Sequence, residues 1–479
     1  MTAQNSPVAA RSHDYDFAIH SRWGLKGRMI SNTGLLGGAR LLSAVMGIAT
    51  LVITARALDD TMLFGALLFI HAYMLFFSEV ASVKSWQALI RFGADEVKAK
   101  NAPRFAALVK TSLVGDILAA VIAFLMAISL FNLFTWLQSV SGLSLGPQIT
   151  ELPTDISLQK MAMIYCTVIL FRQVNTAIGV FRLFDKFTIL AARALVMPTI
   201  RLIGAFIGEA QGWGLVEFLA VWYGSSLMGY LVLHIFGARE ILKRRFGPAL
   251  RGARLCRPSE FNGLYPFVVK TNIDASLRAF KSKFPSLGVT FVFGPAAFAI
   301  YYIAEEISRL LTKAITLFDQ VLFPELSRMA VDLDLKMLFK TAARSAMGIG
   351  IAGFALAGLM MVYGQAIVTS AFDSSFEQTP ALAVMLLIAT SLAGIATPFY
   401  SAFYVMMRPG SAIAVRLIGV AAFIGLFFWL SRSMGLFSIG WAAIAGAVIE
   451  VVLVVIFTIW LIRKRKRDMP SKINKSKAI

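Results

Sequence analysis

Long apolar runs separated by short polar segments occupy most of the chain. A helix needs about 20 predominantly apolar residues to cross a bilayer, because lipid offers the backbone no hydrogen-bond partner. The pattern predicts an all-α integral membrane protein, less apolar in spans one, seven and eight because these contain charged residues. The twelve predicted membrane-spanning helices lie at residues 29–56, 62–83, 105–133, 159–181, 187–208, 213–236, 263–293, 295–322, 345–369, 380–407, 411–430 and 437–462.

The polar segments alternate in their content of lysine and arginine. The segments on one side carry 31 of these bases, whereas the opposite loops carry only Arg432. Lysine and arginine accumulate on the cytoplasmic side of membrane proteins. The alternation therefore predicts that both termini face the cytoplasm. The basic segments are 1–28, 84–104, 182–186, 237–262, 326–344, 408–410 and 463–479.

The longest basic connection, 237–262, divides the twelve spans into two groups of six. Two six-helix halves are a common plan among transporters. The predicted organisation is a cytoplasmic N-terminal segment at 1–28, an N-terminal bundle at 29–236, a basic linker at 237–262, a C-terminal bundle at 263–463 and a basic tail at 464–479.

Composition excludes several other classes of protein. With 58% hydrophobic and 15% charged residues, the chain is too apolar for an ordinary soluble domain. The net charge of +20 would suggest nucleic acid, but the bases lie between apolar runs. Four histidines and two cysteines show neither metal-ligand spacing nor a disulfide framework, and no P-loop motif is present. We therefore expect no nucleic acid, no bound metal, no cofactor and no ATP-binding loop.

Spans seven and eight contain charges that cannot easily reach either interface. At 100° per residue, those of span seven fall within an arc of about 80°, and those of span eight within about 100°. A charge facing lipid at the bilayer centre costs about 2.5–3.5 kcal/mol. These side chains are expected to line an aqueous cavity or to pair with one another. They are Lys270, Asp274, Arg278 and Lys281 in span seven and Glu305, Glu306, Arg309 and Lys313 in span eight.

Cations outnumber acids on these two faces, and Arg40 on a small, polar stripe of span one adds another. The alternative is internal pairing alone, of Arg309 with Glu305 or Glu306 and of the span-seven acid with its i+4 arginine. Because pairing leaves positive charge over, the pattern favours a bound phosphate or pyrophosphate. The expected substrate-binding residues are Arg40, Lys270, Arg278, Lys281, Arg309 and Lys313.

A second charged cluster lies in spans three to five. It consists of Asp116, Arg172, Arg193 and Arg201. Asp116 is expected to pair with Arg172 or Arg40, in a structural role. The residues expected to support ion pairing or ion coupling are Asp116, Arg172, Asp274, Glu305 and Glu306.

Several motifs resemble the polysaccharide-transporter (lipid-linked oligosaccharide and O-antigen flippase) branch of the multidrug/oligosaccharidyl-lipid/polysaccharide exporter superfamily. The resemblance covers residues 29–463 and rests on soft hydrophobic patterns. The motifs are Ala39-Arg40-Leu41-Leu42, the stretch 86–92 (WQALIRF), the stretch 287–295 (LGVTFVFGP) with its tight turn, Tyr301-Tyr302-Ile303-Ala304-Glu305, and the stretch 322–328 (LFPELSR).

The resemblance implies two bundles forming a V-shaped transporter of the bacterial inner membrane that works by alternating access. It implies a substrate of undecaprenyl-pyrophosphate-linked oligosaccharide repeat units, flipped to the outer leaflet for exopolysaccharide, O-antigen or capsule synthesis. Arg40 and the cations of spans seven and eight would contact the headgroup. Coupling to H⁺, Na⁺ or the membrane potential is expected, with membrane lipids and a polysaccharide polymerase as partners.

Two other functions stay open at this point. A multidrug/cation antiporter of the same superfamily would use acids in its first half, but no acid lies between Arg40 and Arg56 or from Met62 to Ser78. An enzyme of glycan assembly would need larger outer loops with convergent acids and bases, and the longest outer loop, 134–158, contains no base and no histidine. We therefore expect a flippase that is not an enzyme.

Overall fold

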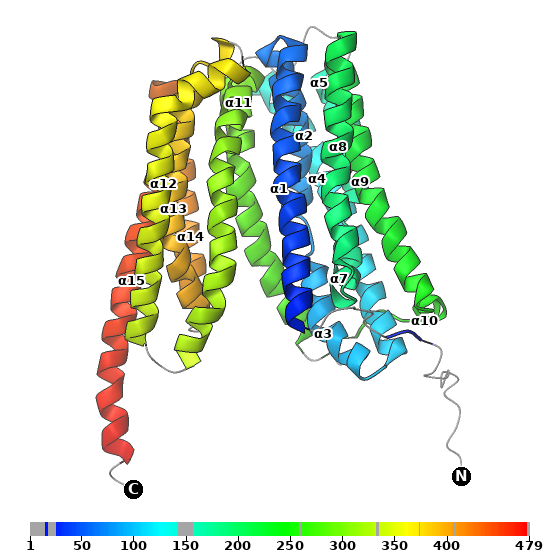
Figure 1. Cartoon of the computed structure of the whole chain (residues 1–479), viewed down its shortest axis with the longest axis vertical. Helices are drawn as coiled ribbons and strands as arrows, with labels where there is room; N and C mark the ends of the chain where they lie inside the picture. Colours follow the sequence, from blue (N-terminus) through cyan, green and yellow to red (C-terminus); the bar gives the residue numbers. More distant parts are fainter. Residues whose placement is uncertain are drawn as a thin grey trace. The chain divides into compact units, whose positions relative to one another are not determined.

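The structure, a computed structural model, describes residues 15–17, 25–141, 157–257, 260–261, 263–331, 335–372, 374–405 and 409–476. Within these ranges all regular secondary structure is helical (Figure 1). The contacts divide the chain into a first unit, Met1–Ser144 with Gln148–Leu287, and a second unit, Leu145–Pro147 with Gly288–Ile479. Each unit is built from long apolar helices, as the hydropathy pattern predicts.

The first unit ends within a long helical run, α11 (Leu264–Val331). Its other helices are α1 (Leu25–Leu58), α2 (Thr61–Val80), α3 (Ser85–Lys98), α4 (Ala102–Ser141), α5 (Leu158–Cys166), α6 (Ile169–Arg172), α7 (Asn175–Leu183), α8 (Phe187–Gln211), α9 (Leu215–Lys243) and α10 (Gly247–Gly252).

Helix α2 forms the buried centre of the first unit. Every residue from Phe64 to Met74 is buried. The carboxylate of Asp60 caps the helix by accepting a hydrogen bond from the backbone N–H of Met62 at 2.6 Å. Around this centre, α1 packs along α8, and α8 packs along α9 (Figure 1). The buried polar side chains of α2, His71 and Ser78, are therefore surrounded by protein rather than by lipid.

The basic segment expected to be a linker, 237–262, is folded onto the first unit. Phe246 is buried in an apolar cluster with Phe184. Arg244 is only 1% exposed, with its Nε donating to the Glu240 carboxylate at 2.7 Å and its guanidinium 3.8 Å from the centre of the Phe184 ring. An ion pair and an aromatic face together compensate the burial of this cation.

The first part of α11 also belongs to the first unit. Asn272 accepts a hydrogen bond from the backbone N–H of Lys84 at 2.6 Å, and Ser276 donates one to the backbone carbonyl of Val80 at 2.6 Å. The contact boundary therefore falls after Leu287, whereas the charge pattern placed the division before span seven. The difference arises because side chains of α11 satisfy a backbone carbonyl at the end of α2 and a backbone N–H at the start of α3.

The second unit contains the remainder of α11 and, among the described residues, six further helices. Its core includes Leu326, Leu338 and Phe403, which are completely buried. Helix α12 packs along α13, and α15 packs along both α13 and α14 (Figure 1). These six helices are α12 (Leu335–Ala371), the short helix η1 (Ser374–Phe376), α13 (Thr379–Val405), α14 (Pro409–Met434), the short helix η2 (Gly435–Phe437) and α15 (Ser438–Ser476).

Ten apolar helical stretches in the described part of the chain are long enough to cross a membrane. Two of them, Leu264–Asp319 with 56 residues and Ile413–Trp460 with 48, far exceed the roughly 20 residues of one crossing. Gly294 interrupts the first with non-helical angles, φ 85 and ψ 177, and Gly435 interrupts the second with φ 55. The structure therefore agrees with the prediction of about twelve spans in a multi-pass membrane protein.

Replacing Gly294 with alanine is expected to lower the free energy of unfolding by about 1–3 kcal/mol, because its backbone angles are accessible almost only to glycine. Denaturant titration of the full chain in detergent measures this change. Gly425→Ala is the matched control, since a Cβ atom at that helical position meets no atom within 4 Å. Equal losses in both variants would contradict the assignment of strain to the turn.

Candidate functional site

The fourth predicted span, 159–181, is not one continuous helix. It is divided into α5, α6 and α7, with Gln173 at non-helical angles (φ −76, ψ 83). The Gln173 side chain donates to the backbone carbonyl of Ser78 at 2.8 Å and accepts from the Ser82 hydroxyl at 2.9 Å. Irregular backbone at membrane depth is tolerated where protein satisfies its polar groups. These two hydrogen bonds of Gln173 hold the break after α6 against the end of α2.

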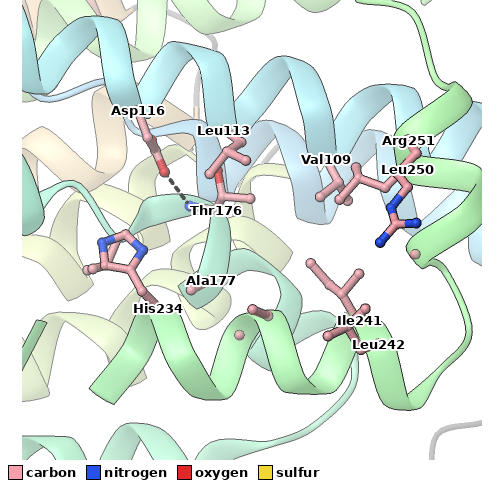
Figure 2. Close-up of a pocket in the computed structure, with 14 residues that line it drawn as sticks. Val109, Leu113, Asp116, Thr176, Ala177, His234, Ile241, Leu242, Leu250 and Arg251 are labelled. Atoms are coloured by element: carbon pink, nitrogen blue, oxygen red, sulfur yellow. Dashed lines mark hydrogen bonds between the residues drawn. The ribbon is translucent and has the colours of Figure 1, made fainter. Parts of the chain in front are cut away.

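Asp116 lies at the N-termini of two helices rather than beside an arginine. Its carboxylate accepts a hydrogen bond from the backbone N–H of Thr176, in the first turn of α7, at 2.7 Å (Figure 2). It accepts a second from the hydroxyl of Ser85, the first residue of α3, at 2.9 Å. Helix N-termini stabilise negative charge through their unpaired N–H groups. The expected ion pair with Arg172 or Arg40 is therefore replaced by a capping contact.

Replacing Asp116 with asparagine is expected to lower the free energy of unfolding by about 1–3 kcal/mol, because a buried N–H or hydroxyl loses an ionised acceptor. Thermal unfolding of the purified chain, followed by tryptophan fluorescence, measures the loss. Asp59→Asn, at an exposed position, is the control and should change the midpoint little. A midpoint for Asp116→Asn equal to that of the wild type would exclude the capping role.

The α6 break places Arg172 in a polar cluster inside the first unit. Its guanidinium forms an ion pair with Glu79 of α2 at 2.6 Å and donates to the Tyr230 hydroxyl of α9 at 3.2 Å. Arg193 of α8 also contacts Tyr230, with its guanidinium over the ring at 5.3 Å from the ring centre. One tyrosine therefore contacts two cations, and one carboxylate pairs with one of them.

The third cation of this region, Arg201, is held by hydroxyl groups. Its Nε donates to Ser225 at 2.9 Å, and its terminal nitrogen donates to Ser226 at 2.8 Å. Its guanidinium also lies 4.3 Å from the centre of the Trp222 ring. Neutral hydroxyls leave the positive charge of Arg201 uncompensated. We refer to Arg172, Arg193 and Arg201 as the arginine cluster.

The arginine cluster carries excess positive charge within the apolar helices. Among the described residues its ion pairs are limited to the one with Glu79. Lys84 and Lys283 also interact electrostatically with that carboxylate. Burial lowers the pKa of Lys84, and repulsion by Arg172 lowers it further. This part of the first unit therefore attracts anions.

Two guanidinium nitrogens of the arginine cluster remain without a protein acceptor. The Nε atoms of Arg172 and Arg193 are buried and have no hydrogen-bond partner in the described part of the chain. Buried donors are normally satisfied, and an unsatisfied one calls for a partner such as an ion or water. Both atoms belong to side chains that contact Tyr230, so an acceptor there would serve two arginines.

The expected substrate-binding cations are distributed over both units. Arg40, Lys270 and Arg278 are exposed, and Lys281 is partly buried, all in the first unit. Arg40 lies close enough to Arg182 for the two cations to repel each other. The side chain of Asp274 lies outside the described residues. Their role as substrate contacts stays a prediction.

In the second unit, the charges of span eight pair with one another. Arg309 bridges Glu305 and Glu306 at 2.9 Å each, and Lys313 lies 3.4 Å from Glu306. Two cations thus face two carboxylates. Internal pairing, the alternative weighed from the sequence, accounts for this cluster without excess charge.

Sequence reasoning assigned the arginine cluster a structural role and missed two members of the site. Glu79 lies at the very end of α2, where its partner could not be read from helical spacing. Tyr230 carries no charge and gave no signal. The charge count could have indicated the site: the predicted spans four and five, 159–181 and 187–208, contain Arg172, Arg193 and Arg201 but no acidic residue.

Comparisons with known proteins agree on the architecture. No protein-family model matches the chain. The inner membrane protein YghQ of Escherichia coli K12 is 24% identical over 302 residues, which cover 63% of this chain and 81% of YghQ.

Solved transporter structures share the fold at low sequence identity. An inward-facing multidrug resistance MATE transporter of the MOP superfamily superposes with a TM-score of 0.68 at 12% identity, covering 90% of this chain and 98% of that one. The lipid II flippase MurJ in an inward closed conformation gives 0.61 at 14%, covering 88% and 87%. A MATE transporter of Vibrio cholerae gives 0.55 at 12%, covering 91% and 98%. The chain therefore has the helical fold of MATE transporters and of MurJ.

Proposed function

We propose that the protein is a flippase for lipid-linked glycans. The substrate is an undecaprenyl-pyrophosphate-linked oligosaccharide repeat unit, moved from the cytoplasmic to the outer leaflet for exopolysaccharide, O-antigen or capsule synthesis. The observation that carries the proposal is the arginine cluster, three guanidinium groups with one paired carboxylate inside apolar helices. The fold shared with a lipid II flippase supports it.

The chemistry of the arginine cluster favours phosphate over other anions. Guanidinium groups present several N–H donors in a planar fork that matches phosphate oxygens. The Nε atoms of Arg172 and Arg193, which have no acceptor among the described residues, supply donors from two side chains that both contact Tyr230. A pyrophosphate carries enough oxygens to accept from both arginines. It would also compensate the charge that Glu79 alone does not balance.

A multidrug/cation antiporter is the competing function, because the fold is also that of MATE transporters. Its substrates are lipophilic cations, which the excess positive charge of the arginine cluster would repel. The described acid of this region, Glu79, is already engaged by Arg172 at 2.6 Å. The charge balance of the first unit therefore favours an anionic substrate.

The remaining features of the proposal follow from this role. The protein would act by alternating access in the bacterial inner membrane, with both termini in the cytoplasm, and would not be an enzyme or need a cofactor. Outward movement of an anion is assisted by an inside-negative potential, at about 2.3 kcal/mol per charge per 100 mV. Coupling to H⁺ or Na⁺ is the alternative. A polysaccharide polymerase and other assembly proteins would take over the flipped substrate.

Reconstitution into liposomes tests the proposal. A polyprenyl pyrophosphate carrying a fluorescent sugar is incorporated, and a membrane-impermeant quencher reports its movement between leaflets. We expect protein-dependent movement of this probe and at least tenfold slower movement of the uncharged polyprenol-linked sugar. Equal rates for both probes, or transport of ethidium without movement of either, would overturn the flippase assignment.

A further inference from the structure

A lateral groove opens on the first unit between α4 and α9. It has a volume of about 400 Å³, within the range of roughly 300–1,000 Å³ typical of ligand sites. Its floor is formed by α7, and α10 closes one end (Figure 2). Val109, Ala177, Ile241 and Leu250 are among the apolar side chains that line it. All of these elements belong to one unit, so the groove is a feature of that unit alone.

The groove opens among side chains that face outward. Leu242 at its rim is 64% exposed, and the neighbouring Ile117 on α4 and Ile235 on α9 are 56% and 62% exposed. In a membrane-spanning helix such apolar surface faces hydrocarbon. A cavity left empty there would forfeit dispersion contacts along its walls. A hydrocarbon chain of the surrounding lipid would supply those contacts.

The two ends of the groove differ in charge. Asp116 and His234 lie at one end and Arg251 at the other (Figure 2). The carboxylate of Asp116 already accepts two hydrogen bonds and would repel a phosphate. His234 contacts the backbone carbonyl of Phe171 at 3.0 Å. A lipid phosphate is therefore excluded from that end.

Arg251 is suited to hold the headgroup. It is exposed on α10, just beyond the apolar end of α9, where a lipid headgroup lies. Among the described residues its guanidinium has neither an ion-pair partner nor a hydrogen-bond acceptor. Because the apolar trough is not selective among lipids, this charge decides which lipid is preferred.

We propose that the lateral groove binds one acidic membrane phospholipid, with an acyl chain in the trough and the phosphate on Arg251. The chain would run past Val174 and Thr176, which line the groove beside the α6–α7 break. It would thereby cover the irregular backbone on its lipid side. The proposal does not depend on the transported substrate, because the groove includes no member of the arginine cluster.

Native mass spectrometry of the full chain, after partial removal of lipid, tests this site. The probes are phosphatidylglycerol and phosphatidylcholine with identical acyl chains. We expect one phosphatidylglycerol to be retained preferentially by the wild type. Arg251→Gln should reduce its retention roughly fivefold, since one interfacial cation contributes about that factor. Arg254→Gln, an exposed arginine of the same segment outside the groove, should retain it normally.

A second variant tests the trough itself. Ala238→Phe fills the groove from α9, and Ala220→Phe places the same side chain at another exposed position of that helix. Only Ala238→Phe should lose the retained lipid, with an unchanged thermal midpoint. Equal retention of the two phospholipids by the wild type would overturn the proposal, as would normal retention by Ala238→Phe. Displacement of phosphatidylglycerol by equimolar polyprenyl phosphate would assign the groove to the polyprenyl chain instead.

Discussion

Replacing Arg193 with glutamine is expected to slow movement of the pyrophosphate-linked probe in liposomes about 10- to 150-fold. The described contact of this guanidinium is the face of Tyr230, and its Nε has no acceptor in the described residues. A charge-assisted hydrogen bond to substrate phosphate is worth about 1.5–3 kcal/mol, which converts to that range of rates. The free energy of unfolding, in contrast, should fall by no more than about 2 kcal/mol, since only a cation–π contact is lost.

The control for this experiment is Arg432→Gln, which removes the same charge at an exposed position in the last turn of α14. Its rate and thermal midpoint should equal those of the wild type. A slow rate for Arg193→Gln together with a lowered midpoint would indicate that the arginine acts through folding. An unchanged rate would remove the arginine cluster from the transport mechanism.

Replacing Arg172 with methionine is expected to lower the free energy of unfolding by about 3–5 kcal/mol. The reason is that the variant leaves the partly buried carboxylate of Glu79, 30% exposed, without its arginine, and the loss of one partner of a buried ion pair carries at most this cost. Tyr230 also loses the donor to its hydroxyl. Denaturant titration in detergent measures the effect, with Lys313→Met as the control. Lys313 pairs with Glu306 at an exposed position, and such pairs contribute about 0–1 kcal/mol.

The double variant Glu79→Gln/Arg172→Met separates charge from packing. Removing both charges leaves no unpaired carboxylate, so most of the lost stability should return. Transport should remain impaired, because one member of the arginine cluster is still absent. If the double variant were as unstable as Arg172→Met alone, packing rather than the ion pair would account for the effect.

The local pattern of the chain predicted much of the fold. The twelve spans and the tight turn at Gly294 depend on hydropathy or on close neighbours in the chain, and so does the pairing of Arg309 with Glu305 or Glu306, which the charge pattern offered only as the alternative to substrate binding. Such features survive any tertiary arrangement, because a membrane helix must satisfy its backbone internally. The break at Gln173 was not predictable in the same way. Glutamine is a good helix former, and the break is stabilised by the backbone carbonyl of Ser78 in α2 and by the hydroxyl of Ser82 just after that helix.

The candidate site likewise has features that the sequence predicts and features that only tertiary contacts set. The sequence by itself determined that the chain crosses the membrane repeatedly and that cations remain inside the spans, since hydropathy and charge are properties of each segment. Only the tertiary structure decided the partners: Glu79 for Arg172, the Tyr230 ring for Arg193, and two helix N-termini for Asp116. These contacts join residues dozens of positions apart, so no periodicity encodes them. They show that the span-eight charges pair with one another and that the arginine cluster holds excess positive charge of its own.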